Sequence, residues 1–185
     1  LVMPGLIELH TDNMERHIMP RPKTFWPIAA AVLNHDREIA AAGITTVFDA
    51  LSLGFSEGGE MRGRLIAEFV PTLDNHISAG ALKVDHLLHL RCEVSSESLL
   101  SQLDELIDHP AVRLVSVMDH TPGQRQWRDL DIYRNYRRTK KNIVWTDSEF
   151  ADHIAKLTAF RNEQIQWHQV CESTYDNYMI RRSRS

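Results

Sequence analysis

The chain has 185 residues, of which 25% are charged and 43% are hydrophobic, and this balance predicts a soluble globular protein of one or two domains. Its apolar runs are shorter than the roughly 20 residues of a membrane-spanning helix, and its first residues lack the pattern of a signal peptide. Two cysteines are too few for a disulfide framework and predict a cytoplasmic location, while the net charge of -4 gives no overall basic surface for nucleic acid.

Strands and helices are expected to alternate along the first half of the chain. Residues 6–10 form a short apolar segment after Pro-Gly and predict a strand. Residues 28–42 carry an apolar stripe at helical spacing, with a proline before it and Gly43 after it, and predict a helix. The β-branched run at residues 45–50 predicts a second strand.

The alternation continues in the second half. A glycine-rich loop is expected at residues 54–63, and then a helix at 65–79 that Pro71 breaks or kinks. Further elements are predicted as follows: strands at 86–94 and 114–119, a helix after Ser95 or Ser96 that contains Leu99, Leu103 and Leu106, and a helix at 147–170.

Connections of this length predict parallel strands with helices packed outside. About four βα units are visible, whereas a closed barrel needs about eight units and about 250 residues. We therefore predict an α/β fold that is part of a TIM-type (β/α)8 barrel over residues 1–170, followed by a basic, disordered tail at 171–185. An open doubly wound sheet is the alternative.

Ionisable residues occur at the end of every predicted strand. They are His10 with Asp12, then Asp49, then residues 89–93, and then Asp119 with His120. Residues i and i+2 of a strand project to the same face about 6.5 to 7 Å apart, so His10 and Asp12 are predicted to bind one divalent ion. Asp119 and His120 are candidates to complete this site or to hold a second ion.

Other polar residues in these segments have simpler interpretations. Asp49 is as consistent with a structural capping role as with a functional one, and His86 is expected to be an ordinary partly buried histidine. Cys92, between apolar neighbours, is expected to be a small core residue.

Basic and amide side chains accompany the strand ends. Arg21 follows the first strand, Arg91 ends the third, and Gln124 with Arg125 follows the fourth. Guanidinium groups suit phosphate oxygens, so these residues predict an anionic, phosphorylated substrate. Solvated loop charge is the alternative interpretation.

Several blocks of sequence carry a family resemblance. Residues 2–12, with Pro-Gly-Leu-Ile-Glu-Leu-His, resemble the first barrel strand of the amidohydrolase superfamily. Residues 10–13, 19–22, 43–47, 89–93 and 118–126 resemble a branch of that superfamily that acts in bacterial phosphonate catabolism. The resemblance extends from about residue 1 to about residue 135.

The resemblance implies a metal-dependent diphosphatase that hydrolyses a ribosyl triphosphate to the 5-phosphate and pyrophosphate. It places His10 and Asp12 at the first-strand ligand positions. The bridging carboxylate of the superfamily is assigned to Asp119, with Glu93 as the competitor and His120 beside it. Asp12 and Asp119 are the expected catalytic carboxylates, and the cofactor is a divalent Zn, Mn or Mg ion.

The resemblance ends before the C-terminus. The later histidine and the closing aspartate that the superfamily supplies have no counterpart after residue 170. Half of a barrel exposes two sheet edges, so we expect the chain to be marginally stable and to self-associate, with homo-oligomers as one outcome. We also expect its catalysis to be impaired. A non-catalytic remnant that binds metal or phosphate is the alternative function.

A third hypothesis is nucleic-acid binding. Residues 134–141 are basic with an interleaved tyrosine, a composition that suits phosphate contact and base stacking. Such runs more often form solvated loops, and acidic residues predominate in the preceding chain, so nucleic acid is not the expected partner.

Overall fold

The computed structural model describes residues 2–22, 24–54 and 65–182; for residue 65 and residues 166–182 only the backbone is described. The chain divides into two compact units. Unit 1 comprises Leu1–Cys92 and Ser101–Ser116, and unit 2 comprises Glu93–Leu100 and Val117–Ser185.

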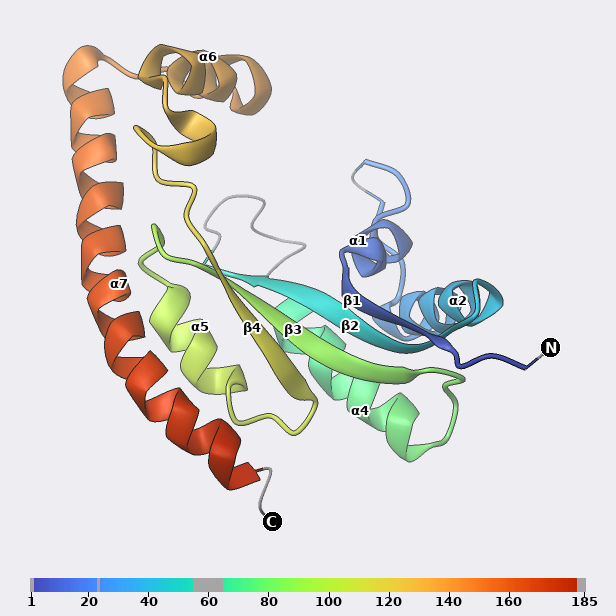
Figure 1. The fold of residues 1–185 in the computed structure, drawn as a ribbon. Helices are drawn as coiled ribbons and strands as arrows, with labels where there is room; N and C mark the ends of the chain where they lie inside the picture. Colours follow the sequence, from blue (N-terminus) through green and yellow to red (C-terminus); the bar gives the residue numbers. More distant parts are fainter. Residues whose placement is uncertain (1, 23, 55–64, 183–185) are drawn as a thin grey trace. The chain divides into compact units, whose positions relative to one another are not determined.

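A four-stranded parallel sheet is the central element of unit 1. Its strands follow the order of the chain and are β1 (Leu6–Thr11), β2 (Ile44–Leu53), β3 (Asp85–Glu93) and β4 (Val112–Met118). Figure 1 shows the sheet as a curled surface. The prediction of four parallel strands is confirmed, and the curled sheet is consistent with part of a barrel.

Helices follow the strands as the alternation predicted. They are α1 (Asn13–Ile18), α2 (Ile28–Ala41), α4 (Val70–Ser78) and α5 (Leu99–Leu106). A π-helical turn, η1 (Leu65–Phe69), precedes α4, and Pro71 lies in the first turn of α4. Pro71 therefore marks the change of helix type, because proline lacks the amide hydrogen that a continuous helix needs there. The predicted loop at 54–63 lies, beyond Gly54, outside the described residues.

The two faces of the sheet differ sharply. On β2, Val47, Asp49, Leu51 and Leu53 point to the same face and are buried. This face packs against α2, whose Ala31, Val32 and Ile39 are also fully or almost fully buried. The register pairs Ala50 with His89 on the opposite face, which we call the inner face. The apolar core of unit 1 therefore lies between the sheet and α2, and the inner face carries polar side chains.

Unit 2 contains η2 (Arg125–Trp127), α6 (Leu130–Lys141) and α7 (Asp147–Arg182). Asp129 caps α6 by accepting hydrogen bonds from the backbone amides of Asp131 and Ile132. Asn142 ends α6 in the left-handed conformation, with φ of 55°. Aromatic rings of Trp127, Tyr133, Trp145 and Phe150 contact one another and form the apolar centre of this unit.

Two elements of unit 2 differ from the expectation. The basic run at 134–141 lies in α6 and is not a loop, because a capped helix begins at Leu130. Helix α7 extends to Arg182, beyond the predicted end at 170, and no glycine or proline interrupts its sequence. The domain boundary at 170 and the disorder of the tail stay predictions. Among the described residues, no helix combines the length and apolar character needed to cross a membrane.

Candidate metal centre

His10 and Asp12 lie close together at the end of β1 in unit 1. The Nε2 atom of His10 is 3.5 Å from an Oδ atom of Asp12, and both side chains are partly exposed. Two ligand atoms about 2.1 Å from a tetrahedral ion are separated by about 3.4 Å. The predicted pair therefore has the spacing that one divalent ion requires.

Arg91 also contacts the carboxylate of Asp12. Its guanidinium Nη1 lies 3.0 and 3.2 Å from the two carboxylate oxygens of Asp12. Arg91 comes from β3, where it was predicted to bind substrate phosphate. In this structure its charge is directed at Asp12, so Arg91 and a cation compete for one carboxylate.

His89 joins the same group on the inner face. Its Nδ1 atom is 3.3 Å from Nδ1 of His10, and its Nε2 atom is 2.7 Å from Oγ of Ser116 on β4. Burial, followed by the charges of His10 and Arg91, lowers the pKa of His89 below its ordinary value. His89 is therefore held as a neutral ring between β1 and β4.

A second cluster of ligand-type side chains lies on the opposite face of the sheet. His35 from α2, Asp49 from β2 and His86 from β3 are buried, and their ligand atoms all lie within 4.8 Å of one another. This His-Asp-His group could hold a metal ion. His86 was expected to be partly buried, but it is only 4% exposed because α2 covers this face of the sheet.

Hydrogen bonds connect this buried cluster. His35 Nε2 lies 2.8 Å from one oxygen of Asp49, and His86 Nδ1 lies 2.7 Å from the other. These separations are typical of hydrogen bonds and shorter than the about 3.4 Å between two ligands of a tetrahedral ion. Asp36 extends the network, since it lies 3.3 Å from His86 Nε2 and accepts from the amides of Lys83 and Val84.

The network stabilises the charged forms of Asp49 and His86. Burial acts to raise the pKa of Asp49, but hydrogen bonds from His35 and His86 outweigh it, so the pKa lies below the ordinary value. Burial acts to lower the pKa of His86, but its bonds to Asp49 and Asp36 raise the pKa above the ordinary value. We therefore describe the cluster as an ionic hydrogen-bond network that joins α2 to the sheet.

In unit 2, Glu93 and His120 form a close pair. The carboxylate of Glu93 contacts Nδ1 of His120 and also accepts from the backbone amide of His120 and from Ser95. Burial would raise the pKa of Glu93, but the hydrogen bonds from His120 and Ser95 lower it. A carboxylate that accepts a hydrogen bond from Nδ1 fixes the orientation of a histidine ring and leaves Nε2 free to coordinate a metal ion.

Asp119 is surrounded by donors in the same unit. Gln124 Nε2 lies 2.8 and 2.7 Å from its two oxygens, and Arg161 Nε lies 2.8 Å from Oδ2. Burial would raise the pKa of Asp119, but the hydrogen bonds, first that of Arg161, lower it. Sequence reasoning missed Arg161, because α7 is distant in sequence and its arginine has no local motif.

The predicted phosphate-binding residues have different surroundings. Gln124 is bound to Asp119, as Arg91 is to Asp12. Arg125 Nε lies 3.9 Å from Asp119, its side chain is 72% exposed, and its backbone has a positive φ of 47°. Arg21 is exposed. Cys92 is buried as predicted, and burial raises the pKa of its thiol to about 12.

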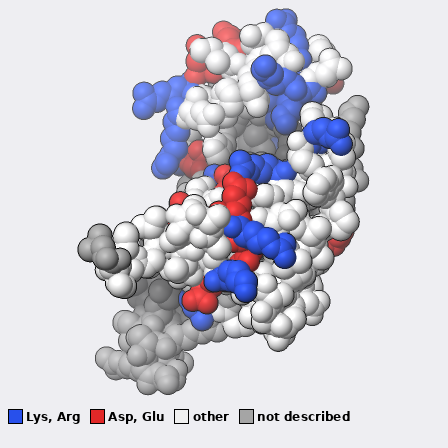
Figure 2. Space-filling view, turned by 90° about the vertical axis from the view of Figure 1, so that its right-hand side faces the viewer, with Lys and Arg blue, Asp and Glu red and all other residues white. Residues whose placement is uncertain are grey.

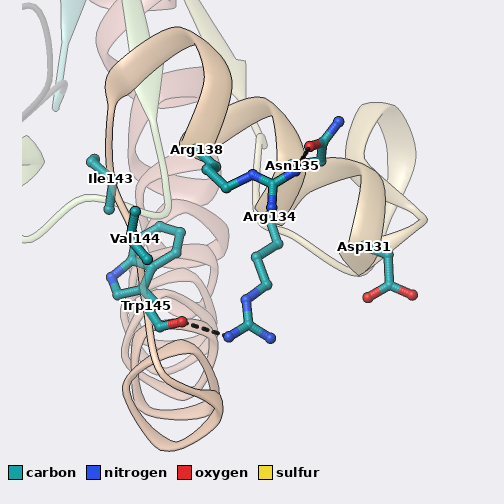
Figure 3. A pocket seen from close by; sticks show the side chains of 7 residues that line it. All are labelled: Asp131, Arg134, Asn135, Arg138, Ile143, Val144 and Trp145. Carbon is teal, nitrogen blue, oxygen red and sulfur yellow. Dashed lines mark hydrogen bonds between the residues drawn. The ribbon is translucent and has the colours of Figure 1, made fainter.

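The basic helix α6 borders a shallow pocket of about 330 Å³ in unit 2. Figure 3 shows Arg134 donating to the carbonyl of Trp145 and Arg138 extending toward Asn135. Arg134 also pairs with Asp147, and Arg138 donates to Asn135, so part of the basic run is engaged within unit 2. Figure 2 shows Asp and Glu among the Lys and Arg on the face that it draws.

The protein is thus an α/β chain with a parallel sheet that carries His and Asp side chains, residue types that bind divalent metals, on both of its faces. It is 38% identical over 152 residues to the alpha-D-ribose 1-methylphosphonate 5-triphosphate diphosphatase of Escherichia coli (strain K12). This comparison confirms the resemblance of the motifs to a diphosphatase, whereas the amidohydrolase superfamily stays a prediction.

The aligned region is 82% of this chain and 40% of that enzyme. The chain therefore spans well under half the length of its relative. No family model matches the sequence. No solved structure matches it either.

Proposed function

We propose that the protein takes part in phosphonate catabolism by hydrolysing alpha-D-ribose 1-methylphosphonate 5-triphosphate to the 5-phosphate and pyrophosphate. The similarity to the E. coli diphosphatase supports this proposal most directly. The curled parallel sheet supports a TIM-type amidohydrolase barrel, of which these strands would form one part. In this reaction water adds across the anhydride bond between the first and second phosphates.

The cation is proposed to bind at His10 and Asp12. The ligand atoms have the separation that one ion requires, and imidazole and carboxylate together suit Zn or Mn, while Mg is the third candidate. A bound divalent ion polarises a phosphoryl oxygen and lowers the pKa of a water molecule. Asp12 is proposed as a catalytic carboxylate because its oxygens lie at this position.

Arg91, Gln124, Arg125 and Arg21 are proposed to bind the phosphates. Arg91 is next to the proposed cation ligand, and a guanidinium that leaves Asp12 can donate to two phosphate oxygens. Arg125 has an exposed side chain on a backbone of positive φ, a conformation that costs about 1 kcal/mol or more in a non-glycine residue. Such strain is typical of functional positions.

Asp119, His120 and Glu93 are proposed as further cation ligands in unit 2. Their carboxylates are ionised, as metal coordination requires, because hydrogen bonds lower both pKa values. The bond from Glu93 to Nδ1 of His120 favours Nε2 of His120 as the coordinating atom. Glu93 is then proposed as a ligand of one ion that also orients His120, and not as a bridge between two ions.

The test is pyrophosphate release from a ribosyl triphosphate, followed by phosphorus NMR with added Zn, Mn or Mg. We expect cation-dependent release that Asp12→Asn abolishes. His109→Gln is the matched control, because His109 forms a similar ion pair with Asp74, 2.9 Å away on α4. Release of single phosphates, or release that needs no cation, would contradict the proposal.

The alternative is a protein that binds cation and phosphate without turnover. The observation that favours it is the occupation of Asp12 by Arg91 and of Asp119 by Arg161 and Gln124. In that case a triphosphate and a divalent cation would raise the melting temperature of the chain, and phosphorus NMR would detect no pyrophosphate.

A further inference from the structure

We propose that His89 is a positioning residue that orients His10 for cation binding. This inference rests on the proposed function, since it takes His10 and Asp12 as the cation-binding pair. It adds a role for the row of side chains His10, His89 and Ser116, which crosses the inner face from β1 to β4.

The contact between the rings defines which atom of His10 faces the cation. Nδ1 of His10 lies 3.3 Å from Nδ1 of His89, whereas Nε2 of His10 lies beside Asp12. Ligation at Nε2 needs the lone pair of that atom, so the single ring hydrogen of neutral His10 must be on Nδ1. His89 Nδ1 is then the acceptor of that hydrogen.

Ser116 completes the arrangement. If Nδ1 of His89 accepts, its hydrogen is on Nε2, and Nε2 lies 2.7 Å from Oγ of Ser116, which can accept it. The two contacts of the His89 ring therefore require one accepting and one donating nitrogen, which is the hydrogen pattern of a neutral imidazole.

The sheet register makes the contact feasible. Ala50 of β2 is paired with His89, and its side chain is a single methyl group. The rings of His10 and His89 can therefore approach over the intervening strand, with centroids 5.2 Å apart in an edge-to-face orientation. His89 is 7% exposed and fixed on two sides, whereas the side chain of His10 is 42% exposed. The buried ring restrains the exposed one.

The experiment measures zinc affinity of the full chain by calorimetry. His89→Leu removes the acceptor and should weaken zinc binding by about 10- to 100-fold. His89→Asn should retain most of the affinity, because its Oδ1 can accept near the position of Nδ1. Leu87→Ala is the control, because it also shortens a side chain on the same face of β3. This variant should bind zinc like the wild type.

Nitrogen-15 NMR of the zinc-loaded chain supplies an independent readout. The hydrogen should be on Nδ1 of His10 and on Nε2 of His89. Unchanged affinity in His89→Leu, or the opposite tautomers, would overturn the role of His89 while leaving the cation pair intact. A wild-type chain without zinc affinity would overturn both the cation pair and the role of His89. Equal losses in His89→Leu and His89→Asn would show that the ring acts only by filling space and would also overturn the inference.

Discussion

At the scale of single residues, Asp12 lies between two competing interactions. His10 Nε2 is 3.5 Å from one oxygen of Asp12, and Arg91 Nη1 is 3.0 Å from the other. The arginine neutralises the carboxylate that a cation would use, and the same arginine is the β3 residue proposed to bind a phosphate group. If Arg91 left Asp12 to bind a phosphate, Asp12 would become available to the cation. Binding of the substrate and binding of the cation would then be coupled.

Replacement of Arg91 tests this coupling. Arg91→Gln should strengthen zinc binding by up to about fivefold, because it removes a positive charge beside Asp12 at a partly exposed position. The same substitution should weaken tripolyphosphate binding. Arg113→Gln, at a β4 arginine that donates to a backbone carbonyl, is the control. Weaker zinc binding in Arg91→Gln would contradict the competition.

The residue types of the site could be read from the sequence, but their partners could not. His10, Asp12 and Arg91 lie at or near the ends of predicted strands, and this position makes them candidates. The pairing of Arg91 with Asp12 depends on the stagger of β1 and β3 about β2, which no local pattern specifies. His35 and Asp36 gave a usable signal, namely two ionisable residues within the apolar stripe of a predicted helix.

At the scale of elements, the network of His35, Asp49, His86 and Asp36 connects α2 with β2 and β3. Its members are buried where apolar side chains would otherwise meet, so each charge depends on the others for stabilisation. Removing one partner of a buried ionic pair leaves the remaining charge without compensation. The network therefore determines how firmly α2 is attached to the sheet.

Asp49→Asn should lower the free energy of unfolding by about 3 kcal/mol or more, measured by urea denaturation with EDTA present. Asp74→Asn is the control, because Asp74 also contacts a histidine but its side chain is 47% exposed, and its loss should cost less than about 1 kcal/mol. A loss in Asp49→Asn as small as that control would show that the network contributes little to stability.

The pH dependence of stability follows from two pKa shifts. The lowered pKa of Asp49 gives stabilisation that is present above its ordinary value of 3.8 and is lost as the pH falls through the folded value. The raised pKa of His86 gives stabilisation that is present below 6.5 and is lost as the pH rises through the folded value. The contribution of the network should be largest between these limits, as urea denaturation across the pH range would show.

Element prediction succeeded where chain-breaking residues marked the boundaries and failed where they did not. Pro71 lies at the start of α4, and Gly43, with φ of 81°, follows α2. Helix α6 was missed because half of its 12 residues are charged, and only Tyr133 and Arg137 are buried. Asp129 as its cap was the available signal.

At the scale of the whole molecule, β1 presents an edge with exposed apolar side chains. Leu6, Ile7 and Leu9 are 52%, 62% and 58% exposed on a strand that pairs only with β2 among the described residues. An edge strand with free backbone groups and apolar side chains favours pairing with another chain. We therefore expect homo-oligomers that form through β1.

Ile7→Lys should shift the chain toward monomer in sedimentation velocity at increasing concentration, because a charge on an edge strand opposes strand pairing. Ile132→Lys is the matched control, since Ile132 is equally exposed at 62% but lies on helix α6. Equal effects of the two substitutions would indicate that general hydrophobicity, and not the β1 edge, drives association.

The zinc content of the purified chain, measured by mass spectrometry of metals, tests whether the cation binds at His10 and Asp12. Wild-type protein and Asp49→Asn should each retain zinc, whereas Asp12→Ala should lose it. Zinc that is retained in Asp12→Ala but lost in Asp49→Asn would place the ion in the buried network between α2 and the sheet. That result would contradict the proposed role of His10 and Asp12.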